Sequence, residues 1–220
     1  MMSLFQLQNI KDRIYLVTCG SHYDTTMLFL RYQEYYESPN PRFRNNSFTL
    51  TEYMSWYSKD RNKGYFSYPE DWGGFNFPAK IIQEVWDKGI SDPNHYDYLM
   101  RGLLGMIKDD GAEDAYLIGT FEGQDYDRYL RHEIAHGLFY TNSTYQMNTK
   151  NLIGKLPYNV FTRVKDALHK KGYPSLVVED EMQAYSSCGE KLVEFEYEND
   201  AVKYEEFIAS IVDVYNRSCE

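Results

Sequence analysis

One five-residue segment constrains this chain more than any other feature of its sequence. Residues 132–136 read HEIAH, so two of the five histidines in the 220-residue chain lie four positions apart. The segment 125–140 is predicted to be a helix, and side chains four residues apart on a helix share one face, about 6 Å apart along the axis. The chain must therefore fold so that His132 and His136 face the same point.

Two imidazoles on one helical face can bind a single zinc ion, with Zn–N bonds of about 2.0–2.1 Å. Glu133 is offset from His132 by about 100° around the helix, so it can reach a water on the metal without displacing a ligand. A carboxylate in that place matches the general base of metal-assisted hydrolysis. The alternative is a solvated His-Glu-His face, with the apolar residues of the segment turned toward the core.

The segment RHEIAHGLFY resembles the active-site helix of the HExxH zinc metallopeptidases, the zincins. The metzincin branch of that family has a third histidine six residues after the second, where this chain has Asn142. The gluzincin branch instead takes its third ligand from a glutamate on a later helix. The resemblance also implies that the predicted strand 115–121 is an edge strand above the active-site helix.

A second segment resembles the third-ligand helix of small gluzincin-like peptidases. Residues 179–185 read EDEMQAY, which contains the pattern Glu-x-x-Ala-Tyr. The resemblance implies that Glu181 is the third zinc ligand, with Glu179 as the next candidate and Asp180 as an aspartate alternative. Only one of the three is expected to face the metal, because successive helical residues point about 100° apart. The competing interpretation is favourable negative charge at a helix N-terminus.

A peptidase also needs a hydrogen-bond donor for the oxyanion that forms on the scissile carbonyl. Tyr140 continues the row of His132 and His136, and Tyr185 follows Glu181 by one helical turn. Both tyrosines are candidate donors. Because the chain has 22 tyrosines, an ordinary packed tyrosine is the alternative for each.

Composition excludes several classes of function. The chain has 33 acidic and 23 basic side chains and a net charge of -10, which argues against binding nucleic acid or an anionic membrane surface. Its apolar runs are shorter than the roughly 20 residues that a membrane span needs. The three cysteines form no CxxC pair, which favours a reduced compartment, and we expect the cytoplasm. The sequence does not indicate an oligomeric state.

The hydrophobic patterns predict an α+β fold that is mostly helical with a small sheet. The resemblance to the zincins implies that this fold is zincin-like, with the sheet beside the active-site helix. We expect a single domain, 1–220, with an N-terminal lobe of about 1–110 and a catalytic part of about 111–220. Segment 61–77 is expected to be an aromatic loop with little regular structure. Strands are predicted over 13–18, 115–121 and 192–197. Helices are predicted over 24–37, 49–59, 78–86, 91–109, 125–140, 157–170, 177–187 and 200–216, with a helical turn at 149–153 and a turn at Gly123.

These observations predict a zinc-dependent metallohydrolase that acts on a peptide or protein substrate. His132, His136 and Glu181 are the expected Zn²⁺ ligands, and Glu133 is the expected general base. One alternative is a catalytically inactive zincin-fold module that binds or regulates a partner, with the 61–77 segment as its surface. Another is metal-assisted hydrolysis of a bond other than a peptide.

Overall fold

The chain divides into two compact units, Met1–Tyr129 and Leu130–Glu220, each with its own apolar core. The computed structural model describes residues 5–61, 63–112, 114–121 and 125–220, so the turn predicted at Gly123 lies outside the described residues. Both this boundary and the predicted one near residue 110 place the HEIAH segment in the C-terminal part. The single-domain expectation remains a prediction.

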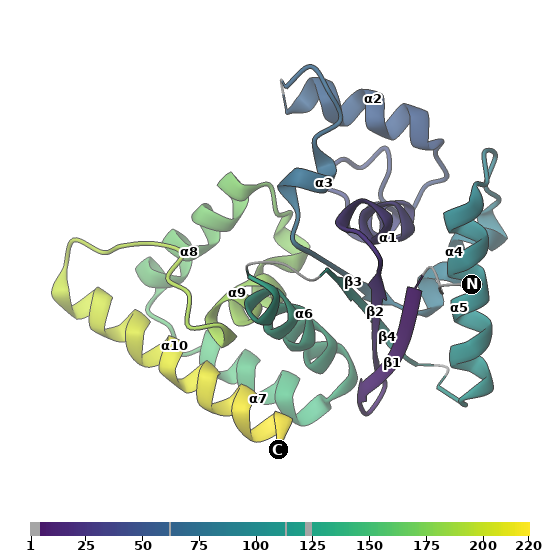
Figure 1. The fold of residues 1–220 in the computed structure, drawn as a ribbon. Helices are drawn as coiled ribbons and strands as arrows, with labels where there is room; N and C mark the ends of the chain where they lie inside the picture. The colour runs from purple at the N-terminus through teal and green to yellow at the C-terminus, as the bar shows by residue number, and fades with distance from the viewer. Residues whose placement is uncertain (1–4, 62, 113, 122–124) are drawn as a thin grey trace. The chain divides into compact units, whose positions relative to one another are not determined.

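The first unit contains a four-stranded sheet (Figure 1). Its strand order is β1 (Phe5–Lys11), β2 (Ile14–Cys19), β4 (Tyr116–Thr120) and β3 (Gly74–Pro78). β2 and β4 are parallel, and the two outer pairings are antiparallel. The strands predicted over 13–18 and 115–121 are therefore present, but β4 is an interior strand and not the expected edge strand, because β2 and β3 pair with its two sides.

Among the described residues of the first unit, five helices accompany this sheet: α1 (His22–Glu37), α2 (Leu50–Asp60), α3 (Tyr68–Asp71), α4 (Lys80–Lys88) and α5 (His95–Asp109). α1 packs against the sheet through Phe29, whose ring centroid lies 5.8 Å from that of Phe75 and 5.3 Å from that of Phe77. The Ser21 hydroxyl caps α1, so this helix begins two residues before the predicted start at residue 24. Thr49 and Glu52 form the capping box that opens α2, which lies within one residue of the predicted range 49–59.

The aromatic segment 61–77 has more regular structure than its composition predicts. It contains α3 and most of β3, and Phe75 and Phe77 are almost completely buried. Pro78 ends β3 and does not begin a helix, because a proline fits an outer strand that leaves its nitrogen unpaired. α5 begins after Asn94 and not at residue 91, since the Asn94 side chain caps it.

All regular secondary structure among the described residues of the second unit is helical. α6 (Tyr126–Thr141) runs into it from the first unit and is followed by α7 (Ser143–Ile153), α8 (Tyr158–Lys171), the short 3₁₀ helix η1 (Ser175–Val177), α9 (Val178–Ser187) and α10 (Glu198–Cys219). α10 packs along α7 and α9, and α8 also contacts α9 (Figure 1). α7 is a full helix where only a turn at 149–153 is predicted.

The predicted strand 192–197 is wrong. Residues of this segment alternate in polarity, but the segment is irregular and lies against helices, with no neighbouring strand among the described residues to complete a ladder. Leu192, Val193 and Phe195 pack on the core of the second unit, and the Leu192 N–H donates to the Tyr204 hydroxyl at 3.1 Å. Partial burial of apolar side chains therefore occurs here without strand pairing.

The α+β class and the predominance of helix are confirmed by this arrangement of one small sheet and many helices. The sheet belongs to the first unit, and residues 132–136 belong to the second. Within the described parts of the chain, none of the helices combines the length and apolar character needed to cross a membrane.

Packing of α1 on the sheet predicts a steric effect at Gly119 in β4. A Cβ atom there would lie 2.4 Å from Cε2 of Phe29, so Gly119→Ala is expected to lower the free energy of unfolding by about 1–3 kcal/mol. Gly102, in the exposed middle of α5, has open space around its Cα, so Gly102→Ala is expected to raise that free energy by about 0.5–1 kcal/mol. Urea denaturation measures both values, and equal effects of the two changes would contradict this packing.

Candidate metal centre

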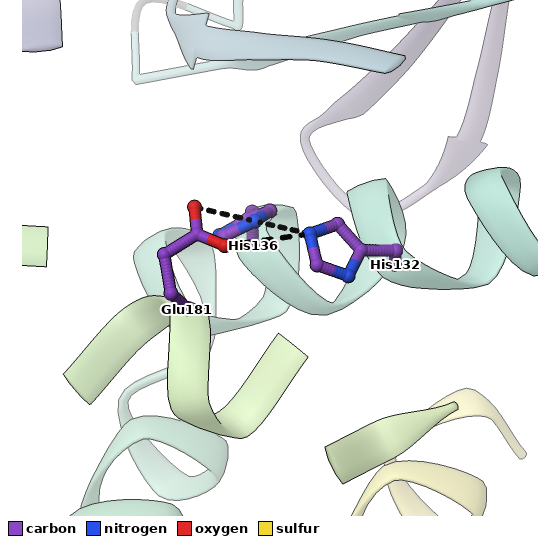
Figure 2. A group of neighbouring side chains, drawn as sticks. All are labelled: His132, His136 and Glu181. Atoms are coloured by element: carbon purple, nitrogen blue, oxygen red, sulfur yellow. Dashed lines mark hydrogen bonds and ion pairs between the residues drawn. The ribbon is translucent and has the colours of Figure 1, made fainter. Parts of the chain in front are cut away.

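The second unit brings His132, His136 and Glu181 together, with their side chains pointing toward one another (Figure 2). His132 and His136 lie one turn apart on α6, and Glu181 lies in the first turn of α9. The Nε2 atoms of the two histidines are 3.1 Å apart. The two carboxylate oxygens of Glu181 lie 3.5 Å from Nε2 of His136 and 3.6 Å from Nε2 of His132.

These three residues fit a metal ion in both donor chemistry and spacing. Two imidazole nitrogens and one carboxylate oxygen are the donor set of many catalytic zinc sites. A tetrahedral ion with bonds of about 2.0–2.2 Å separates its ligand atoms by about 3.3–3.6 Å, close to the separations seen here. The Oε2 atom of Glu181 is buried and has no hydrogen-bond partner among the described residues. A cation between the three side chains would satisfy it.

The surroundings of the two imidazoles are strongly negative. Burial alone lowers the pKa of His136, but the charges of Asp180 and Glu181 outweigh burial and raise it to about 9. Burial also lowers the pKa of His132, whereas contacts with Cys188 and Glu181 and the charge of Glu133 raise it well above its usual value. The fold thus concentrates carboxylates around a point where a positive charge is favoured.

Asp180 supports His136 from the side opposite Nε2. Its Oδ1 atom lies 2.8 Å from His136 Nδ1 and accepts a 2.9 Å hydrogen bond from the Gln183 side chain. Gln183 also donates to the Ala135 carbonyl and accepts a 2.6 Å hydrogen bond from the Tyr145 hydroxyl. A carboxylate on the distal nitrogen of a metal-binding histidine fixes its tautomer and ring orientation. Asp180 therefore lies behind His136 and is not itself in the group of three.

Arg131 joins α6 to the end of α9. Its Nε donates to the Ser187 carbonyl at 2.5 Å, and its Nη2 donates to the Asn216 side chain at 2.9 Å. The guanidinium also lies 4.0 Å from the centroid of the Tyr215 ring on α10. Because Arg131 precedes His132, these contacts fix the helix on which the first imidazole is carried.

Glu133, the predicted general base, lies between the two histidines in the sequence. It is buried, with 4% of its surface exposed. His136 is 2% exposed and Glu181 is 3% exposed. The alternative of a solvated His-Glu-His face therefore does not hold for this helix. The charge of Glu133 acts on both His132 and Tyr185, which places it close to the group of three.

The two candidate oxyanion donors differ in their surroundings. The ring of Tyr185 packs edge-on against His132, with centroids 4.7 Å apart, and its hydroxyl lies 3.1 Å from that of Tyr173. Burial and the charge of Glu181 raise the pKa of Tyr185 to about 12, so it keeps its proton at neutral pH. Tyr140, one turn beyond His136, is 36% exposed. Glu179, the other acidic candidate, is exposed as well.

Sequence reasoning missed the residues that support the predicted ligands. Gln183 lies three positions after Asp180, so helical spacing alone places the two on neighbouring parts of one face. That spacing was a usable signal for their hydrogen bond. Tyr145 and Tyr173 carried no comparable signal, because they are two of many tyrosines and come from other elements of the fold.

Comparisons with known proteins give no information about this centre, so its interpretation rests on its own chemistry. No protein-family model, curated protein or solved structure matches the chain. The resemblance to the zincins therefore stays a prediction that rests on two short sequence segments. The donor set and the distances between its atoms do not depend on that resemblance.

The geometry predicts which acidic residue of α9 holds zinc. Glu181→Gln is expected to weaken zinc binding by more than about 100-fold, because a ligand is lost rather than an outer partner. Glu179→Gln removes the same charge two residues away and is expected to leave affinity within about threefold, since this exposed side chain is outside the group. Competition with a chromophoric chelator measures both affinities. Equal losses in the two variants would contradict the assignment of Glu181.

Asp180 has a separate and smaller predicted effect. Asp180→Asn keeps the shape of the side chain but removes the charge that faces His136, so zinc affinity is expected to fall by about 10–100-fold with one zinc still bound at saturation. The same chelator competition, with zinc content measured by mass spectrometry, tests this. A variant that binds zinc as tightly as the unchanged protein would show that Asp180 does not orient the ligand.

Proposed function

We propose that this protein is a zinc-dependent hydrolase of peptide bonds. The observation that carries the proposal is the convergence of His132, His136 and Glu181, with the buried carboxylate of Glu133 beside them. This combination supports hydrolysis better than simple metal storage, because a storage site has no need of a buried base one residue from a ligand. When bound, zinc supplies a Lewis acid and lowers the pKa of water.

Residues of this chain carry out the remaining steps of hydrolysis. Glu133 takes the proton of the attacking water and then delivers it to the nitrogen of the leaving amine. Tyr185, neutral at physiological pH, donates its hydroxyl proton in a hydrogen bond to the oxyanion. Asp180 holds His136 in one orientation throughout. Tyr140 is the second candidate for the oxyanion donor, from the exposed end of α6.

The proposal includes a gluzincin-like arrangement and a cytoplasmic setting. A glutamate as the third ligand on a later helix supports the first part. Three free cysteines support the second, because thiols persist in a reducing compartment. The substrate is proposed to be a peptide or protein, and neither nucleic acid nor a membrane is proposed as a partner, given the net charge of -10.

The role of Glu133 gives the direct test of this function. Glu133→Gln retains the size of the side chain but cannot accept a proton, so cleavage of a quenched fluorescent peptide library by the zinc-loaded protein is expected to fall by about 10²–10⁴-fold. Zinc content and the unfolding midpoint are expected to stay unchanged, because Glu133 is outside the group of three. A variant that cleaves at the original rate would contradict the assigned base. Absence of cleavage by the zinc-loaded original protein would contradict the proposed peptidase activity.

A further inference from the structure

A separate pocket in the second unit is not used by the proposed reaction. Its volume is about 240 Å³, and its walls come from α6, α7, α8, η1 and the first turn of α9. Asp180 lines it, so the pocket adjoins the support of His136. Because Asp180 contacts Nδ1 of that imidazole and the metal ligands face Nε2, the pocket lies behind the metal centre.

One part of the pocket is apolar. Phe139 and Phe161 contribute aromatic rings, and Leu176 leaves 63% of its surface exposed at the rim. Exposed large apolar side chains beside aromatic rings are typical of a surface that covers an apolar group of a ligand. The pocket is smaller than the roughly 300–1,000 Å³ of pockets for drug-sized molecules, so a ligand here is small.

The other part of the pocket carries both signs of charge. Lys150 and Lys165 line it, and neither has an acidic partner within ion-pair distance among the described residues. The ammonium of Lys150 lies 5.4 Å from the centroid of the Phe139 ring. Glu179 and Asp180 supply two carboxylates. A simple anion such as phosphate is attracted by the lysines but repelled by these carboxylates, whereas a ligand with one charge of each sign matches both.

We propose that this pocket binds a free α-amino acid with an apolar side chain. Lys150 and Lys165 receive its carboxylate, Glu179 and Asp180 receive its ammonium group, and Phe139, with the other apolar residues of the pocket, covers its side chain. The assignment follows from the two signs of charge, the apolar wall and the small volume together. It does not depend on hydrolysis at the metal centre.

Calorimetric titration of the full chain with L-leucine and L-phenylalanine tests this site. Saturable binding with one site per chain is expected. L-leucinamide lacks the carboxylate and N-acetyl-L-leucine lacks the ammonium, so each is expected to bind about tenfold or more weakly than leucine. The titration is run on chelator-treated and on zinc-loaded protein, because a free amino acid can also bind zinc directly. Binding is expected in both.

Matched lysine variants locate the binding. Lys150→Gln combined with Lys165→Gln is expected to weaken leucine binding by about tenfold or more, whereas Lys170→Gln, on α8 but outside the pocket, leaves it unchanged. Unfolding midpoints of the variants confirm that they remain folded. The proposal is overturned if neither amino acid binds, if either blocked derivative binds as well as leucine, or if binding needs zinc. Unchanged binding by the double variant overturns it as well.

Discussion

The structure of the second unit depends on how its buried charges are compensated between α6 and α9. Glu181 is 3% exposed, and one of its carboxylate oxygens has no hydrogen-bond partner among the described residues. A buried carboxylate is costly unless it is paired or coordinates a metal. The imidazoles of His132 and His136 are its neighbours, and the spacing of the three side chains fits one cation between them. The packing of α6 on α9, the buried charge and the proposed metal binding therefore all involve these three side chains.

The essential part of this centre was accessible from the sequence, since HEIAH on a helix places two histidines on one face by spacing alone. The acidic triplet of α9 was predicted to supply one ligand, and the structure gives its members three different environments. Glu181 faces the imidazoles, Asp180 lies behind His136, and Glu179 is exposed. Which residue took which place was decided by the rotation of α9 against α6, a tertiary property that local patterns do not encode.

The fold could be predicted from the sequence to a similar extent. Helices with clear caps, such as α2 with its Thr49 capping box, were predicted almost to the residue. Strands were harder, because pairing depends on distant partners: β4 proved to be interior, and segment 192–197 alternates without being a strand. The aromatic segment that ends at Phe77 was expected to be irregular, but its alternating phenylalanines are buried against α1. Long-range packing overrode local composition at each of these places.

X-ray absorption spectroscopy at the zinc edge of the zinc-loaded chain identifies the atoms that bind the metal. We expect two imidazole nitrogens at about 2.0–2.1 Å and the remaining ligands as oxygen at about 2.0–2.2 Å. Cys188 contacts His132, so a sulfur ligand is the nearest competing arrangement. A sulfur shell at about 2.3 Å, or a first shell without two imidazoles, would contradict a centre built from His132, His136 and Glu181.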